Sequence, residues 1–274
     1  MHYGIELAPF GAHANPRNVV PLAQAAEAAG WESIFVWDHL NWGSWPVPAG
    51  DPWVILSAVA ASTDRLRLGT NVSPLPRYKL HGWGRTLATL DQLSGGRLTL
   101  GVGLGFVHEE YTAFGEPGDY TTRAAMVDEG LPLLDRLMAG ETVTHDGEHY
   151  TMEKVTMRPR PVQQPRLPIW IGGESKPALR RAAQWDGWVM GSIDENCEIT
   201  KTPDELAEQV AYLREHRTTD APFEIAIAGA TTGPEDDQPQ AYAEAGATWW
   251  LESIFGLRGS DEELLARIEA GPPR

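Results

Sequence analysis

Asp38 and His39 place a carboxylate beside an imidazole, immediately after the apolar run WESIFVW at residues 31–37. A histidine exchanges protons near neutral pH and can act as a general acid or base at the end of a strand. The structural alternative is a loop histidine beside a helix-capping aspartate, because neighbours in sequence need not be in contact. We take His39 and Asp38 as the candidate catalytic residues.

Two segments carry small residues where the next apolar runs end. LGTNVSP at residues 68–74 contains Thr70, Asn71 and Val72, and GVGLGF at residues 101–106 alternates glycine with larger residues. Alternating glycines remove side chains from one face of a strand, so that a flat group can lie close to the backbone. A plain turn and simple close packing explain the same two patterns. The glycine segment is not a dinucleotide fingerprint, which needs another spacing and a helix after it.

The segment IGGESKP at residues 171–177 is the clearest local signal for a binding site. Gly172 and Gly173 allow an unusual backbone, and Ser175 can cap the helix that the proline begins. Free amides at a helix N-terminus, with a lysine nearby, favour an anion, and phosphate sites in barrels lie on such loops. An ordinary strand-to-helix turn has the same composition, so both interpretations stay open here.

The chain has 11 tryptophans, of which Trp37 and Trp42 lie near His39 in the sequence. Aromatic walls suit flat cofactors and apolar substrates, although most tryptophans pack in cores or at rims. We take Trp37 and Trp42 as candidate substrate-binding residues. The histidines show neither H-x-H nor H-E-x-x-H spacing, so we expect no metal site.

Strand-like and helix-like segments alternate along the whole chain. Strands are predicted at residues 3–9, 31–37, 65–72, 97–104, 168–171, 187–190, 223–228 and 248–251. Helices are predicted at residues 16–29, 51–63, 80–93, 122–138, 177–185, 203–216, 235–245 and 261–270, with a hairpin at 142–152. This alternation requires a parallel sheet, and eight such units favour a closed (β/α)8 TIM barrel, an α/β fold of one domain over residues 1–274. Residues that carry chemistry should then lie where the strands end.

Charge and cysteine content limit the partners and the compartment. A formal net charge of −16 repels phosphate backbones and anionic lipid surfaces, so we expect neither nucleic acid nor a membrane as a partner. No apolar run approaches the length of a membrane span, and no signal-peptide pattern precedes the first strand. Cys197 is the one cysteine, which fits a reducing compartment. We expect a cytoplasmic protein that acts on a small molecule.

Taken in order, these segments resemble the bacterial luciferase-like family of flavin-dependent monooxygenases and deazaflavin-dependent oxidoreductases. The densest match is LDQLSGGRL at residues 90–98, followed by the glycines of residues 101–105. Shorter matches in the same order are Asp38-His39-Leu40, Leu68-Gly69-Thr70, Glu110-Tyr111, Phe114-Gly115, PIWIGG at residues 168–173 and Asp186-Gly187-Trp188. The resemblance covers about residues 3–190 and is weaker at residues 246–250. It depends on the ordered set, because no single motif is decisive.

The resemblance implies an oxidoreductase with a reduced flavin at the barrel mouth, the end where the strands finish. Reduced FMN from a separate flavin reductase is the preferred cofactor, and the protein would form a homodimer. The residues that would contact the cofactor are Thr70, Asn71, Val72, Gly103, Gly172, Gly173, Glu174 and Ser175. A histidine matching His39 is catalytically important in the family, and an aspartate–histidine pair matching Asp38 and His39 lies near the reactive ring in deazaflavin enzymes.

The resemblance also makes a prediction about the backbone. Family members often carry a non-prolyl cis peptide bond at the end of the third strand, and alignment places it between Asn71 and Val72. Two departures concern the phosphate, because Leu104 and Ala178 stand where luciferase has a phosphate-binding arginine and a phosphate-contacting threonine. Phosphate binding would then depend on backbone amides, Ser175 and a lysine, or the cofactor would sit differently.

Two other functions stay open at this stage. Hydride transfer with coenzyme F420, without oxygen chemistry, fits the same motifs as a monooxygenase that uses reduced FMN. A non-catalytic flavin-binding or cofactor-free barrel is the alternative from another class, and Leu104 and Ala178 are the residues that support it. A metal-dependent hydrolase lacks the necessary ligand spacing.

Overall fold

The computed structural model describes residues 1–40, 47–190, 193–194, 198–256 and 258–273. Trp42 and Cys197 therefore lie outside the described residues. Among the described helices, none is both long enough and apolar enough to cross a membrane.

Eight parallel strands form a closed barrel, as predicted. The strands follow one another around the barrel in the order β3, β2, β1, β11, β10, β9, β8, β5, and pairing of β3 with β5 closes the ring. Their bounds are β1 His2–Leu7, β2 Ser33–Val36, β3 Arg67–Thr70, β5 Leu98–Gly103, β8 Ile169–Gly172, β9 Gly187–Met190, β10 Glu224–Gly229 and β11 Trp249–Ile254. The short β4, Ser73–Pro74, pairs with β5 beyond the end of β3. The predicted continuous strand at residues 65–72 is therefore interrupted after Thr70.

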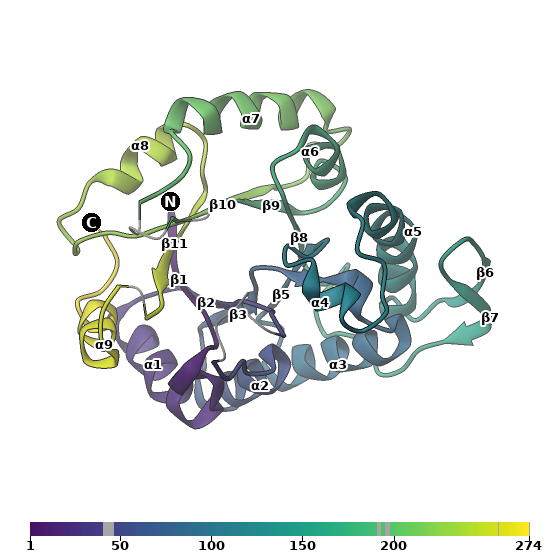
Figure 1. The fold of residues 1–274 in the computed structure, drawn as a ribbon, viewed down its shortest axis with the longest axis horizontal. Helices are drawn as coiled ribbons and strands as arrows, with labels where there is room; N and C mark the ends of the chain where they lie inside the picture. The colour runs from purple at the N-terminus through teal and green to yellow at the C-terminus, as the bar shows by residue number, and fades with distance from the viewer. Residues whose placement is uncertain (41–46, 191–192, 195–197, 257, 274) are drawn as a thin grey trace.

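Helices surround the strands in an outer ring (Figure 1). Their bounds are α1 Pro16–Ala29, α2 Pro52–Ser62, α3 Leu80–Leu93, α5 Tyr120–Met138, α6 Lys176–Ala182, α7 Pro203–His216, α8 Gln238–Glu244 and α9 Asp261–Glu269. Asn15 and Asp51 cap α1 and α2, each with a proline at the first helical position, as the sequence indicates.

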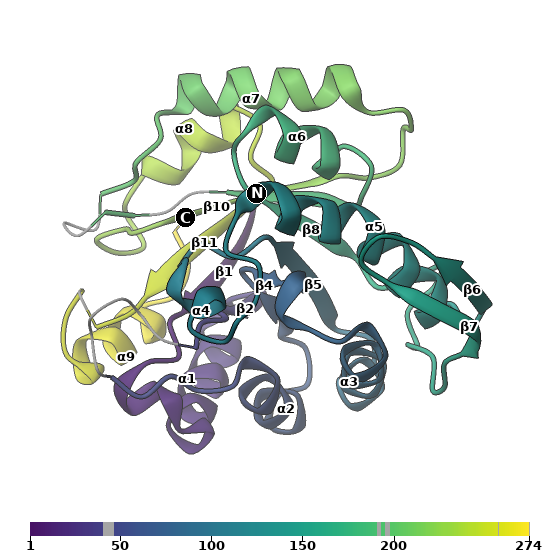
Figure 2. The same cartoon turned by 45° about the vertical axis from the view of Figure 1, so that its right-hand side comes forward.

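Three short helical segments and one helix start were not predicted. α4, Glu109–Thr112, lies inside the ring of helices rather than in it (Figures 1 and 2), and the 3-10 turns are η1, Gly11–Ala14, and η2, Leu75–Arg77. α8 begins three residues later than predicted. The Asp236 carboxylate accepts hydrogen bonds from the amides of Thr232 and Gln238, which holds the preceding residues in a turn.

The predicted hairpin is present. β6, Thr142–Asp146, pairs in antiparallel fashion with β7, Thr151–Thr156, which continues beyond the predicted end. The hairpin projects away from the barrel beside α5 (Figure 2). The Glu129 carboxylate of α5 anchors its turn by accepting hydrogen bonds from the amides of His149 and Tyr150.

The core has two parts because successive side chains of a strand point to opposite faces. The larger part packs strands against helices and includes Ile5, Leu7, Ile34 and Val36. The smaller part fills the barrel interior and consists of Phe35, Trp170, Val189, Ala226, Trp249 and Leu251, with Val72 packed against it. Stacked rings of Phe35 and Trp170, 5.1 Å apart, make this interior a solid support rather than a pore.

Candidate functional site

Val72 forms an apolar platform above the interior core. The peptide bond between Asn71 and Val72 is cis, which confirms the prediction made for this bond. A Cβ atom on Gly103 would lie 2.5 Å from Val72 Cγ2, and one on Gly172 would lie 3.0 Å from both Val72 methyl groups. The glycines at the ends of β5 and β8 therefore accommodate the Val72 side chain, which occupies part of the space that we expected a flat ligand to use.

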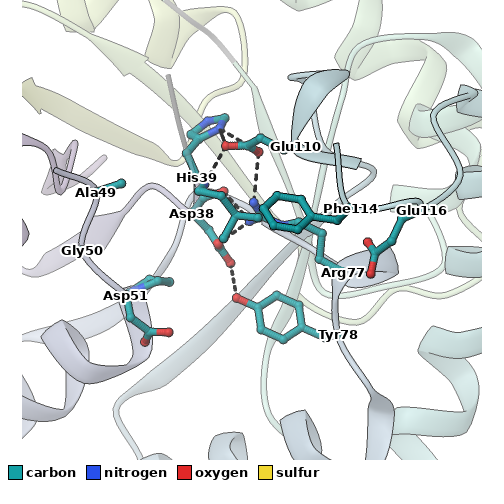
Figure 3. Close-up of a pocket in the computed structure, with 12 residues that line it drawn as sticks. Asp38, His39, Ala49, Gly50, Asp51, Arg77, Tyr78, Glu110, Phe114 and Glu116 are labelled. Atoms are coloured by element: carbon teal, nitrogen blue, oxygen red, sulfur yellow. Dashed lines mark hydrogen bonds and ion pairs between the residues drawn. The ribbon is translucent and has the colours of Figure 1, made fainter. Parts of the chain in front are cut away.

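His39 is held by Glu110, a residue from α4 (Figure 3). The His39 Nδ1 atom lies 3.2 Å and 3.3 Å from the two Glu110 carboxylate oxygens. Because the carboxylate accepts the Nδ1 proton, this contact sets the tautomer of the neutral ring. The His39 side chain is 15% exposed and that of Glu110 is 1% exposed, so solvent can reach the imidazole while its partner is buried.

Glu110 has two further donors that fix its position. Its Oε1 accepts the Leu40 amide hydrogen at 2.6 Å, and its Oε2 accepts from Arg77 Nη1 at 3.0 Å. The carboxylate therefore joins the loop after β2 to η2 and α4. Buried charged groups that are paired and hydrogen-bonded in this way hold a fixed geometry.

Asp38 is buried beside His39, in a separate set of contacts. Its carboxylate accepts hydrogen bonds from Ser73 Oγ and Arg77 Nη2, and from the Tyr78 hydroxyl at 2.6 Å. Arg77 also donates to the Asp38 backbone oxygen at 2.7 Å. Burial raises the pKa of the Asp38 carboxyl, an effect that the Arg77 charge and the two hydroxyls oppose. These contacts favour a role in joining the loops after β2 and β3, and the catalytic role predicted for Asp38 stays a prediction.

Tyr78 contributes a second buried polar group. Burial and the neighbouring Asp38 carboxylate raise the pKa of the Tyr78 hydroxyl, which therefore remains a hydrogen-bond donor. Tyr78 also accepts a hydrogen bond from Trp53 Nε1 at 2.9 Å. A cavity of about 380 Å³ opens beside this network and is lined by Asp38, His39, Leu40, Ala49, Gly50, Asp51, Pro52, Arg77, Tyr78, Glu110, Phe114 and Glu116 (Figure 3).

Trp37, one of the two tryptophans predicted at the site, lies at the barrel mouth. Its ring centroid is 6.3 Å from that of His39 and 5.5 Å from that of Phe255. The Phe10 ring lies 6.2 Å from His39. These rings form an aromatic wall beside the imidazole, and the substrate-binding role of Trp37 stays a prediction.

The loop of residues 172–175 follows β8, as predicted. Ser175 caps α6 by accepting the Ala178 amide hydrogen, and Gly173 adopts a φ of 111° that favours glycine. The Glu174 carboxylate pairs with Lys201 Nζ at 2.8 Å. The expected phosphate contacts of this loop stay predictions, although its backbone geometry is the one that the sequence indicates.

The structure thus brings His39, Trp37 and Val72 to one end of the barrel, and it adds two residues. Glu110 and Arg77 were not assigned a role from the sequence. Both are charged residues that follow soon after a strand end, and this position is the signal in the sequence that could have indicated them. The sequence alone does not show that their side chains are in contact.

The luciferase-like monooxygenase family matches residues 3–269 of this sequence. This chain belongs to that family. An uncharacterised protein of Mycobacterium tuberculosis is 33% identical over 225 residues, which cover 76% of this chain and 75% of that protein. A coenzyme F420-dependent glucose-6-phosphate dehydrogenase of Nakamurella multipartita is 37% identical over 182 residues, 65% of this chain and 52% of the dehydrogenase.

Solved structures of luciferase-like proteins share the fold. A monooxygenase of Streptomyces bottropensis superposes with a TM-score of 0.78 at 21% identity, covering 98% of this chain and 97% of that one. The oxygenating constituent of 3,6-diketocamphane monooxygenase from Pseudomonas putida, solved with FMN, has a TM-score of 0.68 at 18% identity and covers 84% and 67%. These likenesses confirm the luciferase-like barrel.

Proposed function

We propose that this protein is an oxidoreductase that binds coenzyme F420 at the barrel mouth and transfers hydride to or from a small organic substrate. The observation that carries the proposal is the convergence of Val72, Trp37 and the His39–Glu110 pair at the ends of the barrel strands. Active sites of such barrels lie at this end, built from the loops that follow the strands.

The residues at the mouth fit a flat, largely apolar ring. Val72 offers a methyl surface, and Gly103 and Gly172 place no side chain beside it. The loop of residues 172–175 offers backbone amides for an anionic group, in line with its composition. When bound, the deazaflavin would supply the hydride chemistry, and the protein would supply position and proton transfer.

His39 is the residue that we assign to proton transfer. Its Nδ1 is engaged by Glu110, so Nε2 can take a proton from a substrate hydroxyl or return one to it. The contact with the buried Glu110 carboxylate holds the ring in one orientation for this transfer. Trp37 and Phe10 would limit the access of water to the reacting groups.

From the sequence alone, reduced FMN is the preferred cofactor, whereas the comparisons favour coenzyme F420 over FMN. The named relative with 37% identity depends on coenzyme F420, whereas the FMN complex has 18% identity and supports the fold alone. Monooxygenation with reduced FMN from a separate reductase remains the second candidate. The glucose 6-phosphate substrate of that dehydrogenase is not part of the proposal, because the match spans about half of its length.

Two anaerobic titrations of the purified protein test the proposal. One uses oxidised coenzyme F420, followed by its fluorescence, and the other uses reduced FMN. Saturable binding of F420, at least tenfold tighter than that of FMN, is the expected result. Tighter binding of FMN would favour the monooxygenase. Binding of neither cofactor at high micromolar concentration would favour a non-catalytic barrel.

A further inference from the structure

Glu6 is a fully enclosed carboxyl group on β1, close to the barrel mouth. The residue is 2% exposed, and its neighbours in the strand register are Phe35 of β2 and Ser253 of β11. Nothing in the proton transfer proposed for His39 uses it. Burying a carboxyl group costs free energy unless the group is hydrogen-bonded or paired with a charge. The contacts of Glu6 therefore need an explanation.

Three polar groups from three strands or strand ends contact the Glu6 carboxyl group. Oε2 accepts hydrogen bonds from Asn71 Nδ2 at 2.6 Å and from Trp37 Nε1 at 3.4 Å. Oε1 lies 2.5 Å from the Ser253 hydroxyl oxygen. Oε2 thus receives both N–H donors, whereas the contact of Oε1 is with a hydroxyl group that can either donate or accept.

In the described part of the chain, Glu6 has no lysine, arginine or histidine within 4.0 Å. Glu252, on the opposite face of β11, provides the contrast. Its carboxylate is equally buried and pairs with Arg258 at 2.6 Å and Arg267 at 3.3 Å. Buried carboxylates of proteins are normally paired in the manner of Glu252, because an isolated buried charge is strongly unfavourable.

We propose that Glu6 is held as a neutral carboxylic acid and acts as a positioning residue for the site at the barrel mouth. Its proton lies on Oε1 and is donated to Ser253 Oγ, while Oε2 accepts from Asn71 and Trp37. One neutral group thereby fixes the residue that precedes Val72 and the tryptophan that packs beside His39. The benefit for catalysis rests on the proposed function, but the protonation state does not.

The charges around Glu6 favour the same state. The groups that face it are Asn71, which follows β3, Phe35 of β2, Trp37, which follows β2, and Ser253 of β11. None of them is charged at neutral pH. Glu252 is the charged group that acts on Glu6, and it pairs with Arg258 and Arg267. Burial, with a smaller contribution from Glu252, raises the pKa of Glu6, and the hydrogen bonds that it accepts from Asn71 and Trp37 oppose that rise.

Infrared spectroscopy of the protein without cofactor tests this protonation state directly. A protonated carboxyl group has a carbonyl stretch that ionised carboxylates lack. The difference spectrum of wild type minus Glu6→Gln at pH 7 should show one such band, and wild type minus Glu252→Gln should not. A wild-type minus Glu6→Gln spectrum with carboxylate bands only would overturn the proposal.

A second measurement separates positioning from simple loss of fold. Glu6→Gln keeps an acceptor for both N–H groups and an N–H donor for Ser253, so it should bind cofactor within about twofold of wild type. Glu6→Leu removes every hydrogen bond at similar size and should weaken binding about tenfold or more, with its far-ultraviolet circular dichroism retained. Equal loss of binding in both variants would show that Glu6 acts as a charge, which contradicts the proposal.

Discussion

The His39 imidazole and the Glu110 carboxylate are 71 residues apart in sequence and 3.2 Å apart in the structure. The contact exists because α4 lies over the strand ends and carries Glu110 towards the loop after β2. Arg77 and the Leu40 amide hold the same carboxylate, so the imidazole is oriented by a fixed partner. This relationship is the basis of the proton-transfer role that we propose for His39.

Replacing His39 with alanine should remove proton transfer and little else. Turnover should fall by about 100-fold or more, the lower range for loss of a general acid or base. Because His39 is partly exposed, the melting temperature and cofactor affinity should remain near those of wild type. His81→Ala, at an exposed position on α3, is the matched control and should leave turnover unchanged. Equal losses of stability and activity in His39→Ala would indicate a structural role.

Glu110→Gln should reduce turnover without removing the imidazole. The substitution replaces the charge-assisted contacts to His39 and Arg77 with weaker neutral ones. If the loss of about 1.5–3 kcal/mol is felt in the transition state, the rate falls roughly 10- to 150-fold. Steady-state kinetics of both proteins, with circular dichroism to check the fold, measure the effect. Unchanged turnover in Glu110→Gln would contradict a positioning role for Glu110.

The Val72 platform can be tested with a pair of compensating substitutions. Gly103→Ala places a Cβ atom 2.5 Å from Val72 Cγ2, so Val72 must move and cofactor affinity should fall. Overpacking of this kind costs about 1–3 kcal/mol. Adding Val72→Ala to Gly103→Ala removes the colliding methyl group. The double variant should therefore recover part of the unfolding free energy that Gly103→Ala loses. Strictly additive losses in urea denaturation of the double variant would show that the two side chains do not compete for space.

The pH dependence of stability provides a further test of Glu6. Its pKa is raised in the folded state, so the folded protein retains this proton where the unfolded chain has lost it. The contribution of Glu6 to the unfolding free energy is therefore fully present below the ordinary glutamate pKa. It is lost as the pH rises through the pKa of the folded state. Relative to Glu6→Gln, the unfolding free energy of wild type should fall with pH by up to about 1.4 kcal/mol per unit. A difference independent of pH between pH 5 and 8 would count against a neutral Glu6.

The sequence predicts the barrel well because its strands are apolar, regularly spaced and bounded by caps such as Asn15 and Asp51. It also predicts which loops reach the mouth. It does not show which carboxylate bonds to the His39 ring, because adjacent residues of an extended segment point in different directions. Asp38 contacts Ser73, Arg77 and Tyr78, while the carboxylate bonded to the His39 ring comes from a later loop.

Glu6 shows a second limit of prediction from sequence. A single glutamate within an apolar strand can be ionised or neutral, and the choice depends on partners that the fold brings from other strands. Asn71 and Ser253 are such partners, and neither is near Glu6 in the sequence. The cis peptide bond before Val72 was predicted correctly, because its position followed from the family resemblance rather than from composition.

A crystal structure of the protein with saturating coenzyme F420 tests the central claim most directly. The account predicts density for the tricyclic ring against Val72, within reach of His39 and bordered by Gly103 and Gly172. A second cavity, of about 830 Å³, lies at the opposite end of the barrel beside Arg67, Glu224 and Trp249. Ring density in that cavity, or a mouth without density at saturation, would contradict the proposed site.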